Sequence, residues 1–286
     1  MKKGLLIFCC TLLYFASHSA NTSRSLFIHG GNLIAVNDSL IPYVSFNEFD
    51  SFSQNNPVIT LNLGDSLSLW VYNRDTIEHQ FAIKNIDKPS ISIPRLDSIH
   101  IDYFFSQAGN YIYYDPLNYP TNTFLGLAGM IAVKNHNYSS FYWNIKEHDK
   151  LWNTRIRAGA KVDWDTYYPK YFTINGKSNP MINEDSQARI TGKVGDTLIL
   201  YIANTGQSIH SIHFHGYHVT VLFSSKYTTH VGRSKDTCPV FPLESLVLQI
   251  IPDKPGEYPV HDHNLVAASA NNTYPNGMFT TILITE

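Results

Sequence analysis

Two pairs of alternating histidines carry the strongest chemical signal in the sequence. His213 and His215 share one short segment, and His261 and His263 share another. Residues two apart on a β-strand point to the same face, about 6.6 Å apart along the chain, so each pair should present both imidazoles on one side. Neutral imidazole nitrogen binds copper, zinc, iron and nickel without a large charge to bury. The spacing therefore predicts a metal site built from these four histidines.

Short strands are the elements that must position these histidines. The segments 57–63, 66–72 and 197–203 are rich in β-branched and aromatic residues, and Gly, Asn, Asp or Pro bounds them. Several alternate with period two, which is typical of strands. Helical periodicity is scarce, and one short helix is expected over residues 147–156. The pattern predicts an all-β fold of sandwich or barrel type.

A repeated order of residues divides the chain into two halves. His79 follows Asp65 by fourteen residues, and His210 follows Asp196 by the same fourteen. Both aspartates come directly after a glycine, and each half ends with Gly-Met and an apolar strand. Such self-similarity indicates two homologous domains. The expected parts are an N-terminal domain (residues 21–138), an aromatic and charged connector (139–164) and a C-terminal domain (165–286).

The first twenty residues have the features of a secretory signal. Lys2 and Lys3 precede an apolar run over residues 4–15, and small residues follow up to Ala20. No later run reaches the roughly eighteen apolar residues that a membrane helix needs, so no membrane span is expected. With a formal net charge of -2 and no basic cluster, nucleic acid is a poor partner. We expect a secreted or periplasmic protein.

The histidine pattern resembles that of a known family. The order His-x-x-His-x-His-Gly, then Gly-x-Tyr-x-x-His-x-His and a later Gly-Met, is similar to the C-terminal copper signature of the multicopper oxidases, which include laccases and ceruloplasmin. The resemblance covers nearly the whole chain after the signal. It implies two tandem cupredoxin-like Greek-key domains and copper as the cofactor. Zinc is a second candidate on the residues alone, because three histidines and a water can form a hydrolytic site.

The resemblance also implies roles for individual histidines. His213 matches a type 2 copper ligand, and His215, His261 and His263 match type 3 ligands of a trinuclear cluster. In the family, type 1 copper oxidises the substrate by one electron, and the cluster reduces oxygen to water. The N-terminal domain here lacks the two further His-x-His pairs of the family. A smaller site is therefore expected, either mononuclear or shared between subunits, since related two-domain proteins form trimers with copper between subunits.

The type 1 copper position departs from the family pattern. His210 and Met278 match type 1 ligands, but Asp262 stands where the family has the cysteine and Ala267 where it has the second histidine. A blue copper site requires two histidines and a thiolate. Complete laccase-like activity is therefore not expected.

The N-terminal domain repeats this loss. His79 and Met130 are present, but Asp115 stands at the cysteine position. Each aspartate could ligate a metal or accept a hydrogen bond from its histidine, and the second fits better because carboxylate oxygen is a harder ligand than copper selects. Cys238, the only cysteine after the signal, is expected in a loop and outside any metal site, and no intrachain disulfide is expected.

These observations predict an exported, copper-binding protein of multicopper-oxidase type with a degenerate type 1 site and a retained histidine-rich site. Whether it turns over as an oxidoreductase is left open by the sequence. Two alternatives remain: a non-catalytic copper carrier or buffer, and a metal-free β scaffold that binds a partner protein.

Overall fold

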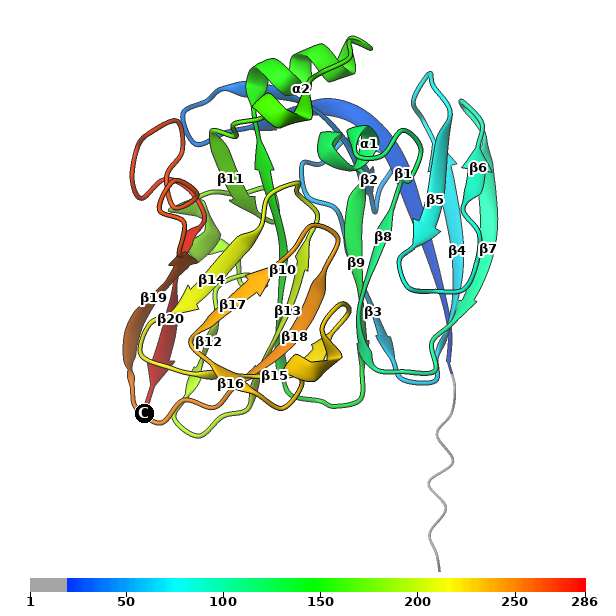
Figure 1. The fold of residues 1–286 in the computed structure, drawn as a ribbon. Helices are drawn as coiled ribbons and strands as arrows, with labels where there is room; N and C mark the ends of the chain where they lie inside the picture. Colours follow the sequence, from blue (N-terminus) through cyan, green and yellow to red (C-terminus); the bar gives the residue numbers. More distant parts are fainter. Residues whose placement is uncertain (1–19) are drawn as a thin grey trace, which may run out of the picture.

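Strands are the main regular elements of the described part of the chain. The computed structural model describes residues 20–286, and the expected signal segment lies outside this range except for Ala20. The strands of the described residues form four sheets (Figure 1). The prediction of an all-β fold of sandwich or barrel type is therefore confirmed.

Two sheets pack face to face in the N-terminal half. One has the strand order β2-β1-β4-β7, and the other has the order β3-β9-β8-β5-β6. The core between them contains Phe46 and Phe81, whose rings meet edge to face at 5.8 Å. The elements of this unit are β1 (Asn21–Ile34), β2 (Leu40–Asn47), β3 (Val58–Asn62), β4 (Ser66–Asn73), β5 (His79–Ile83), β6 (Ile91–Ile93), β7 (Ser98–Phe104), β8 (Gly109–Tyr114), α1 (Thr121–Leu125) and β9 (Ala128–Lys134).

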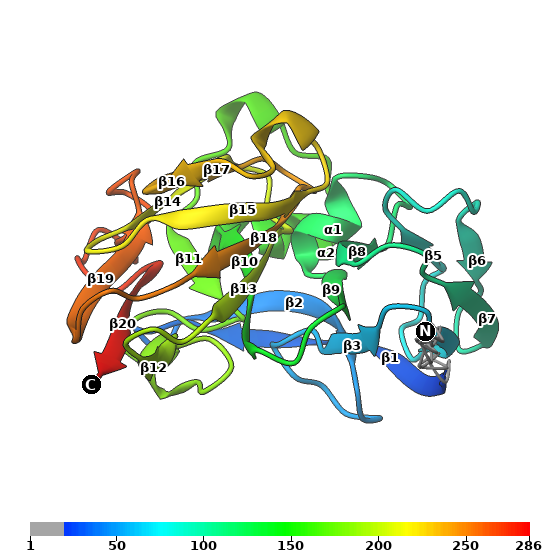
Figure 2. The ribbon, with the colours of Figure 1, turned by 90° about the horizontal axis from the view of Figure 1, so that it is seen from below.

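The C-terminal half repeats this two-layer arrangement. Its sheets have the orders β11-β10-β13-β18-β15-β16 and β12-β20-β19-β14-β17. The elements are β10 (Ser139–His148), α2 (Lys150–Arg157), η1 (Trp164–Thr166), β11 (Tyr171–Ile174), η2 (Met181–Glu184), β12 (Thr191–Lys193), β13 (Leu198–Asn204), β14 (His210–Phe214), β15 (Val219–Ser224), η3 (Thr228–His230), β16 (Ser234–Lys235), β17 (Thr237–Val240), β18 (Ser245–Ile250), β19 (Gly256–Asp262) and β20 (Phe279–Thr285). Figure 2 shows the two units side by side.

The strands follow the alternation of the sequence. In β4, Leu67, Leu69 and Val71 are buried, whereas the intervening Ser68 and Trp70 face outward. Successive side chains of a strand point to opposite faces, so this order allows one face to join the core while the other meets solvent. The first unit's core therefore follows directly from the period-two pattern.

An apolar cluster joins the two units. Ile112 and Met130 from the first unit pack with Tyr201 and Val247 from the second. The Asn110 side-chain amide donates a hydrogen bond to the Ile202 carbonyl at 2.9 Å within this buried region. The two units are thus held together by a packed apolar contact and by a direct hydrogen bond.

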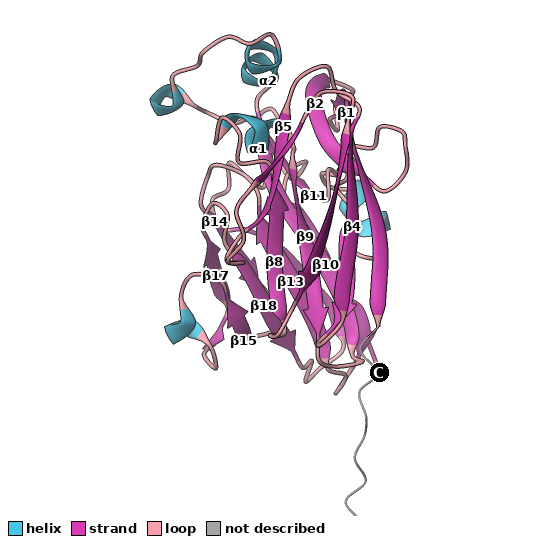
Figure 3. Cartoon of the chain, turned by 90° about the vertical axis from the view of Figure 1, so that its right-hand side faces the viewer, coloured by secondary structure: helices cyan, strands magenta, loops and turns pink. Residues whose placement is uncertain are grey.

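The segment expected to be a connector supplies a strand and a helix. β10 pairs in parallel with β13, which places it inside the larger sheet of the second unit. The chain then forms α2, with Asp149 as its N-cap because that side chain accepts a hydrogen bond from the Trp152 backbone N–H at 3.0 Å. Figure 3 shows α1 and α2 at one end of the sheets. Of the helices in residues 20–286, none has the length and apolarity needed to cross a bilayer.

Replacing Asp149 with alanine is expected to destabilise the protein by about 1 kcal/mol, because it removes the cap of α2. Urea unfolding followed by circular dichroism would measure this loss. Asp149→Ser is the matched control, since a serine hydroxyl also accepts the Trp152 N–H bond and should retain most of the stability. Equal losses in the two variants would contradict the capping role.

Candidate metal centre

Neighbouring strands bring the two histidine pairs together. β14 lies between β17 and β19 in its sheet, and the register of β14 and β19 sets His213 directly opposite His261. His215 follows the end of β14, and His263 follows the end of β19. All four side chains therefore come from two adjacent antiparallel strands, within the short stretch where β14 and β19 pair or one residue beyond the end of either strand.

The four imidazoles form one cluster. The ring centroid of His213 lies 4.6 Å from that of His215, 5.3 Å from that of His263 and 5.8 Å from that of His261. The Nε2 atoms of His215 and His261 are 3.0 Å apart. We call these four residues, His213, His215, His261 and His263, the histidine cluster.

Hydrogen bonds fix two of these rings. Nδ1 of His261 donates to the backbone carbonyl of Asp262 at 2.8 Å, which assigns the proton to Nδ1 and leaves Nε2 unprotonated, as an acceptor toward His215. Nδ1 of His213 lies 2.9 Å from the Thr237 hydroxyl on β17. Metal-binding histidines commonly use their second nitrogen in this way, because the bond sets both the tautomer and the orientation of the ring.

The cluster lies near the surface of the protein. His213 and His261 are half-buried, whereas His215 and His263 are exposed. Partial burial lowers the pKa of His215, and repulsion from the neighbouring imidazoles lowers it further. A lowered pKa favours the unprotonated ring, which is the form that binds metals.

The spacing of His215 and His261 fits two donors of one ion. Metal–nitrogen bonds of about 2.0–2.1 Å, with angles of about 90–110°, separate two nitrogens by roughly 2.9–3.4 Å. The observed 3.0 Å lies in that range. However, the side-chain positions in residues 20–286 include no group of three or more His, Cys, Asp or Glu that could hold a metal ion. The cluster thus offers one ready pair of donors with two further imidazoles beside it.

Behind the cluster, His210 is enclosed by two carboxylates. Its Nδ1 lies 2.6 Å from Oδ2 of Asp262, and its Nε2 lies 3.0 Å from Oε2 of Glu147. All three side chains are at most 1% exposed. Although burial acts to lower it, the hydrogen bonds to Asp262 and Glu147 raise the pKa of His210 to about 9. His210 is therefore an imidazolium at neutral pH, and both of its nitrogens are occupied.

Backbone groups support the two carboxylates. The N–H groups of Gln207 and Ser208 donate to Glu147 at 2.6 and 2.9 Å. Those of Ser211 and Asn264 donate to Oδ1 of Asp262 at 3.2 and 2.9 Å. Each charge in this buried group is thus hydrogen-bonded, as burial requires. We call Glu147, His210 and Asp262 the buried triad.

The first unit holds a related group. Nδ1 of His79 lies 2.8 Å from Oδ2 of Asp115, and its Nε2 lies 3.5 Å from Oδ2 of Asp75. Asp75 in turn pairs with Arg157 of α2 at 2.7 Å. Burial opposes the shift, but the two aspartates raise the pKa of His79. In both units, the aspartate at the expected cysteine position accepts a hydrogen bond from the histidine.

The sulfur-containing residues lie in the packed interior. Met278 is in the core of the second unit, and Met130 is in the cluster between the units. Cys238 is also buried, and burial raises the pKa of its thiol to about 12, which keeps it protonated and unreactive. The expectation of a loop at Cys238 is wrong: the residue lies in β17, opposite Ile212 of β14. Pro239 and the polar residues before it conceal this short strand in the sequence.

Glu147 was not among the residues expected in the site. It comes from β10, within the segment assigned to the connector, and meets His210 from a strand sixty-three residues earlier in the chain. In the structure, Glu147 lies in a strand of ten residues, Ser139–His148, in which eight are buried. A carboxylate at a buried strand position requires a partner, but the sequence does not name it.

Comparisons with known proteins agree with this architecture. The sequence profile of the multicopper oxidase family matches residues 157–276. No curated protein sequence is significantly similar to the chain. Among solved structures, a blue copper oxidase from Nitrosomonas europaea is 20% identical with a TM-score of 0.79, covering 92% of this chain and 86% of that one. A copper nitrite reductase from the same organism is 16% identical, with a TM-score of 0.71 and coverages of 93% and 94%.

A laccase from Botrytis aclada shares the fold at 13% identity and a TM-score of 0.72, covering 93% of this chain and 53% of that one. At such identities the structural likeness establishes the fold. The profile match adds a likeness in sequence over residues 157–276, a range that includes the whole histidine cluster. Residues 157–276 therefore match a multicopper oxidase domain, whereas the preceding part of the described chain is like these proteins in fold.

Proposed function

We propose that the protein binds copper through the histidine cluster and acts as an exported multicopper-oxidase-like protein with a degenerate type 1 site. The observation that carries this proposal is the 3.0 Å separation of the Nε2 atoms of His215 and His261, with two more imidazoles in contact. Copper is the metal of the related enzymes by their names, and nothing in the comparisons supports zinc.

The protein's own residues prepare the cluster for a metal. The Asp262 carbonyl keeps the His261 proton on Nδ1, and Thr237 orients His213. A bound copper ion would supply one-electron redox chemistry at the surface of the second unit. His215 and His263 remain exposed on either side, so donors from a second copy of the chain can reach the same ion. This supports a homo-oligomer, with a trimer as the specific proposal.

The buried triad supports a degenerate type 1 site. Both ring nitrogens of His210 already contact carboxylates, and Cys238, the one cysteine in residues 20–286, is not among its hydrogen-bond partners. An imidazolium cannot coordinate a metal. The usual entry point for electrons is thus replaced by an internal ion pair, and we do not propose complete laccase-like turnover.

Copper content tests the proposal. Protein purified with copper should hold the metal, and His261→Ala should lose most of it because one of the two closest donors is removed. Metal analysis together with paramagnetic resonance would measure both the amount and the ligand set. His218→Ala is the matched control, since His218 is exposed on the same segment and is outside the cluster. Equal copper content in His261→Ala and the wild type would refute the site.

Two further measurements separate the alternatives. Oxygen consumption with phenols or Cu(I) would distinguish an oxidoreductase from a copper carrier that does not turn over. Light scattering with and without copper would show whether the cluster is completed by other copies. A monomer that binds copper at full stoichiometry would refute the shared site while leaving copper binding intact.

A further inference from the structure

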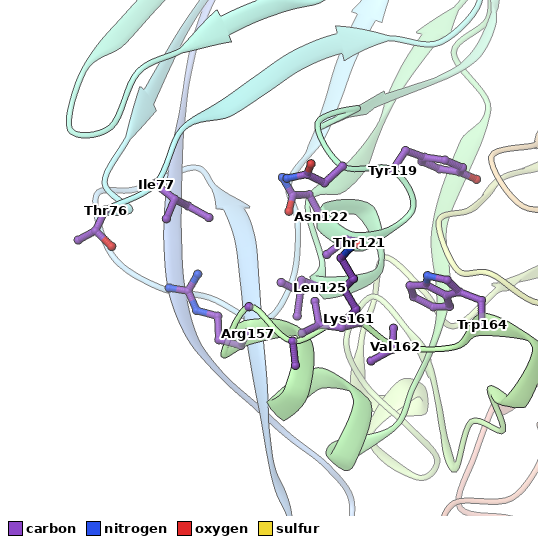
Figure 4. A pocket seen from close by; sticks show the side chains of 14 residues that line it. Thr76, Ile77, Tyr119, Thr121, Asn122, Leu125, Arg157, Lys161, Val162 and Trp164 are labelled. Carbon is purple, nitrogen blue, oxygen red and sulfur yellow. The ribbon is translucent and has the colours of Figure 1, made fainter.

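A pocket of about 810 Å³ opens at the end of the first unit where α1 and α2 lie (Figure 4). Three segments form its walls: the loop between β4 and β5, residues 118–125 with α1, and the end of α2 with the loop that follows. Its volume lies within the range of about 300–1,000 Å³ that is usual for small-molecule sites. None of the cluster histidines lines it, so it is a separate site.

The lining of this pocket is positively charged. Arg157 and Lys161 contribute to it, and none of its 14 lining residues is an aspartate or glutamate. Arg157 is already neutralised by the buried carboxylate of Asp75. Lys161 takes part in none of the ion pairs found in the described part of the chain. The pocket therefore carries one uncompensated positive charge.

Asp75 fixes the position of the Arg157 side chain. Its Nη1 and Nη2 donate to the two oxygens of Asp75 at 2.7 and 3.2 Å. A guanidinium has five N–H groups, so three remain for other acceptors. The Arg157 side chain is 34% exposed, whereas that of Asp75 is 4% exposed. A donor that is already fixed loses little entropy when an anion binds, which favours affinity.

The opposite side of the pocket is apolar and aromatic. Trp164 and Arg157 stand on opposite sides of the opening in Figure 4. The indole of Trp164 packs against the rings of Phe124 and Trp152, each at 5.2 Å, and against Tyr167 at 5.7 Å. The half-buried Trp164 is thus a rigid surface against which another flat ring can pack.

We propose that this pocket binds a small aromatic monocarboxylic acid, with the carboxylate at Arg157 and Lys161 and the ring toward Trp164. One uncompensated charge matches a monoanion better than a phosphate dianion. A divalent cation is disfavoured because the lining offers no carboxylate. Together, the cationic donors and the fixed indole favour a ligand that carries both an aromatic ring and a carboxylate.

Calorimetric titration of the full protein with benzoate, cinnamate and indole-3-acetate tests this proposal. At least one acid should bind, and its primary amide should bind at least about tenfold more weakly, because the amide lacks the charge that the cations recognise. Lys161→Glu should weaken acid binding by a similar factor. Lys150→Glu is the matched control: Lys150 is exposed at the other end of α2 and outside the pocket, so this variant should bind as the wild type does.

A second measurement uses the wild-type protein alone, so it does not depend on whether a variant folds correctly. The indole N–H resonance of Trp164 should shift when the acid is added, and those of Trp70 and Trp143, which lie elsewhere, should not. Failure of all three acids to bind, equal affinity for acid and amide, or tighter binding of inorganic phosphate would each overturn the proposal. So would acid binding that Lys161→Glu leaves unchanged.

Discussion

Replacing His210 with leucine is expected to lower the free energy of unfolding by about 3–5 kcal/mol, the usual cost of removing one partner from a buried charged group. The variant would leave the carboxylates of Glu147 and Asp262 without the imidazolium that both of them contact. Neither carboxylate has access to solvent. Urea unfolding of wild type and variant, both stripped of metal with a chelator, would measure the loss.

The matched control restores charge balance without the histidine. A variant that combines His210→Leu with Glu147→Gln and Asp262→Asn carries no buried charge in this group and should recover a large part of the lost stability. If His210→Leu is as stable as the wild type in the absence of metal, the triad does not stabilise the fold. A loss that appears only with copper present would instead make His210 a metal ligand.

The stabilisation by His210 should also depend on pH. The pKa of His210 is raised from 6.5 to about 9, so the native protein binds this proton more tightly than the unfolded chain does. The contribution is fully present below pH 6.5 and is lost as pH rises through about 9. It amounts to about 3 kcal/mol. The difference in stability between wild type and His210→Leu should therefore shrink between pH 7 and pH 10.

The equivalent change in the first unit should cost less. His79→Leu leaves Asp75 paired with Arg157, and Asp115 still accepts hydrogen bonds from the Gln80 backbone and the Asn122 amide. Asp75 thus keeps a cation as its partner, whereas Glu147 and Asp262 keep only backbone N–H donors in His210→Leu. Comparing the two variants separates the effect of an unpaired charge from that of an empty volume, because the same side chain is removed in each.

Much of the fold and part of the site follow from local patterns. The alternation around Leu67 and Leu69 predicts a strand with one buried face, and the structure has it. The spacing of His213 and His261 within their segments predicts two imidazole pairs, and adjacent strands bring them together. These features depend on the alternation of residue types along a strand and on the repeated order of residues in the two halves. Both can be seen directly in the sequence.

The partners of His210 depend on long-range packing that the sequence does not display. Glu147 reaches the triad only because β10 lies beside β13, a pairing between segments about sixty residues apart. The aromatic and charged residues around Glu147 suggest a linker when read locally. Domain limits placed at residues 138 and 165 remain a prediction, and the pairing of β10 with β13 shows which sheet the intervening strand joins.

Replacing Lys146 with methionine is expected to stabilise the protein at pH 6 by about 3–5 kcal/mol. The Lys146 amine is buried, donates to the Thr123 carbonyl, and lies among the neutral side chains Tyr43, Asn56 and Thr173. Burial lowers its pKa from 10.5 to about 7, although the charge of Glu147 opposes the shift. Each pKa unit is about 1.4 kcal/mol, so a protonated amine here is costly, and an apolar side chain of similar length avoids that cost.

The sign of the pH dependence distinguishes this effect from that of His210. Between pH 7 and about 10.5 the unfolded chain holds a proton on Lys146 that the native protein lacks, so stability from this group rises with pH, whereas the contribution of His210 falls. The advantage of Lys146→Met should therefore disappear toward pH 10. Lys150→Met, at an exposed position four residues away, is the control and should change stability little at any pH. A constant difference between Lys146→Met and wild type from pH 6 to pH 10 would mean that the amine titrates normally, which burial without a carboxylate partner does not allow.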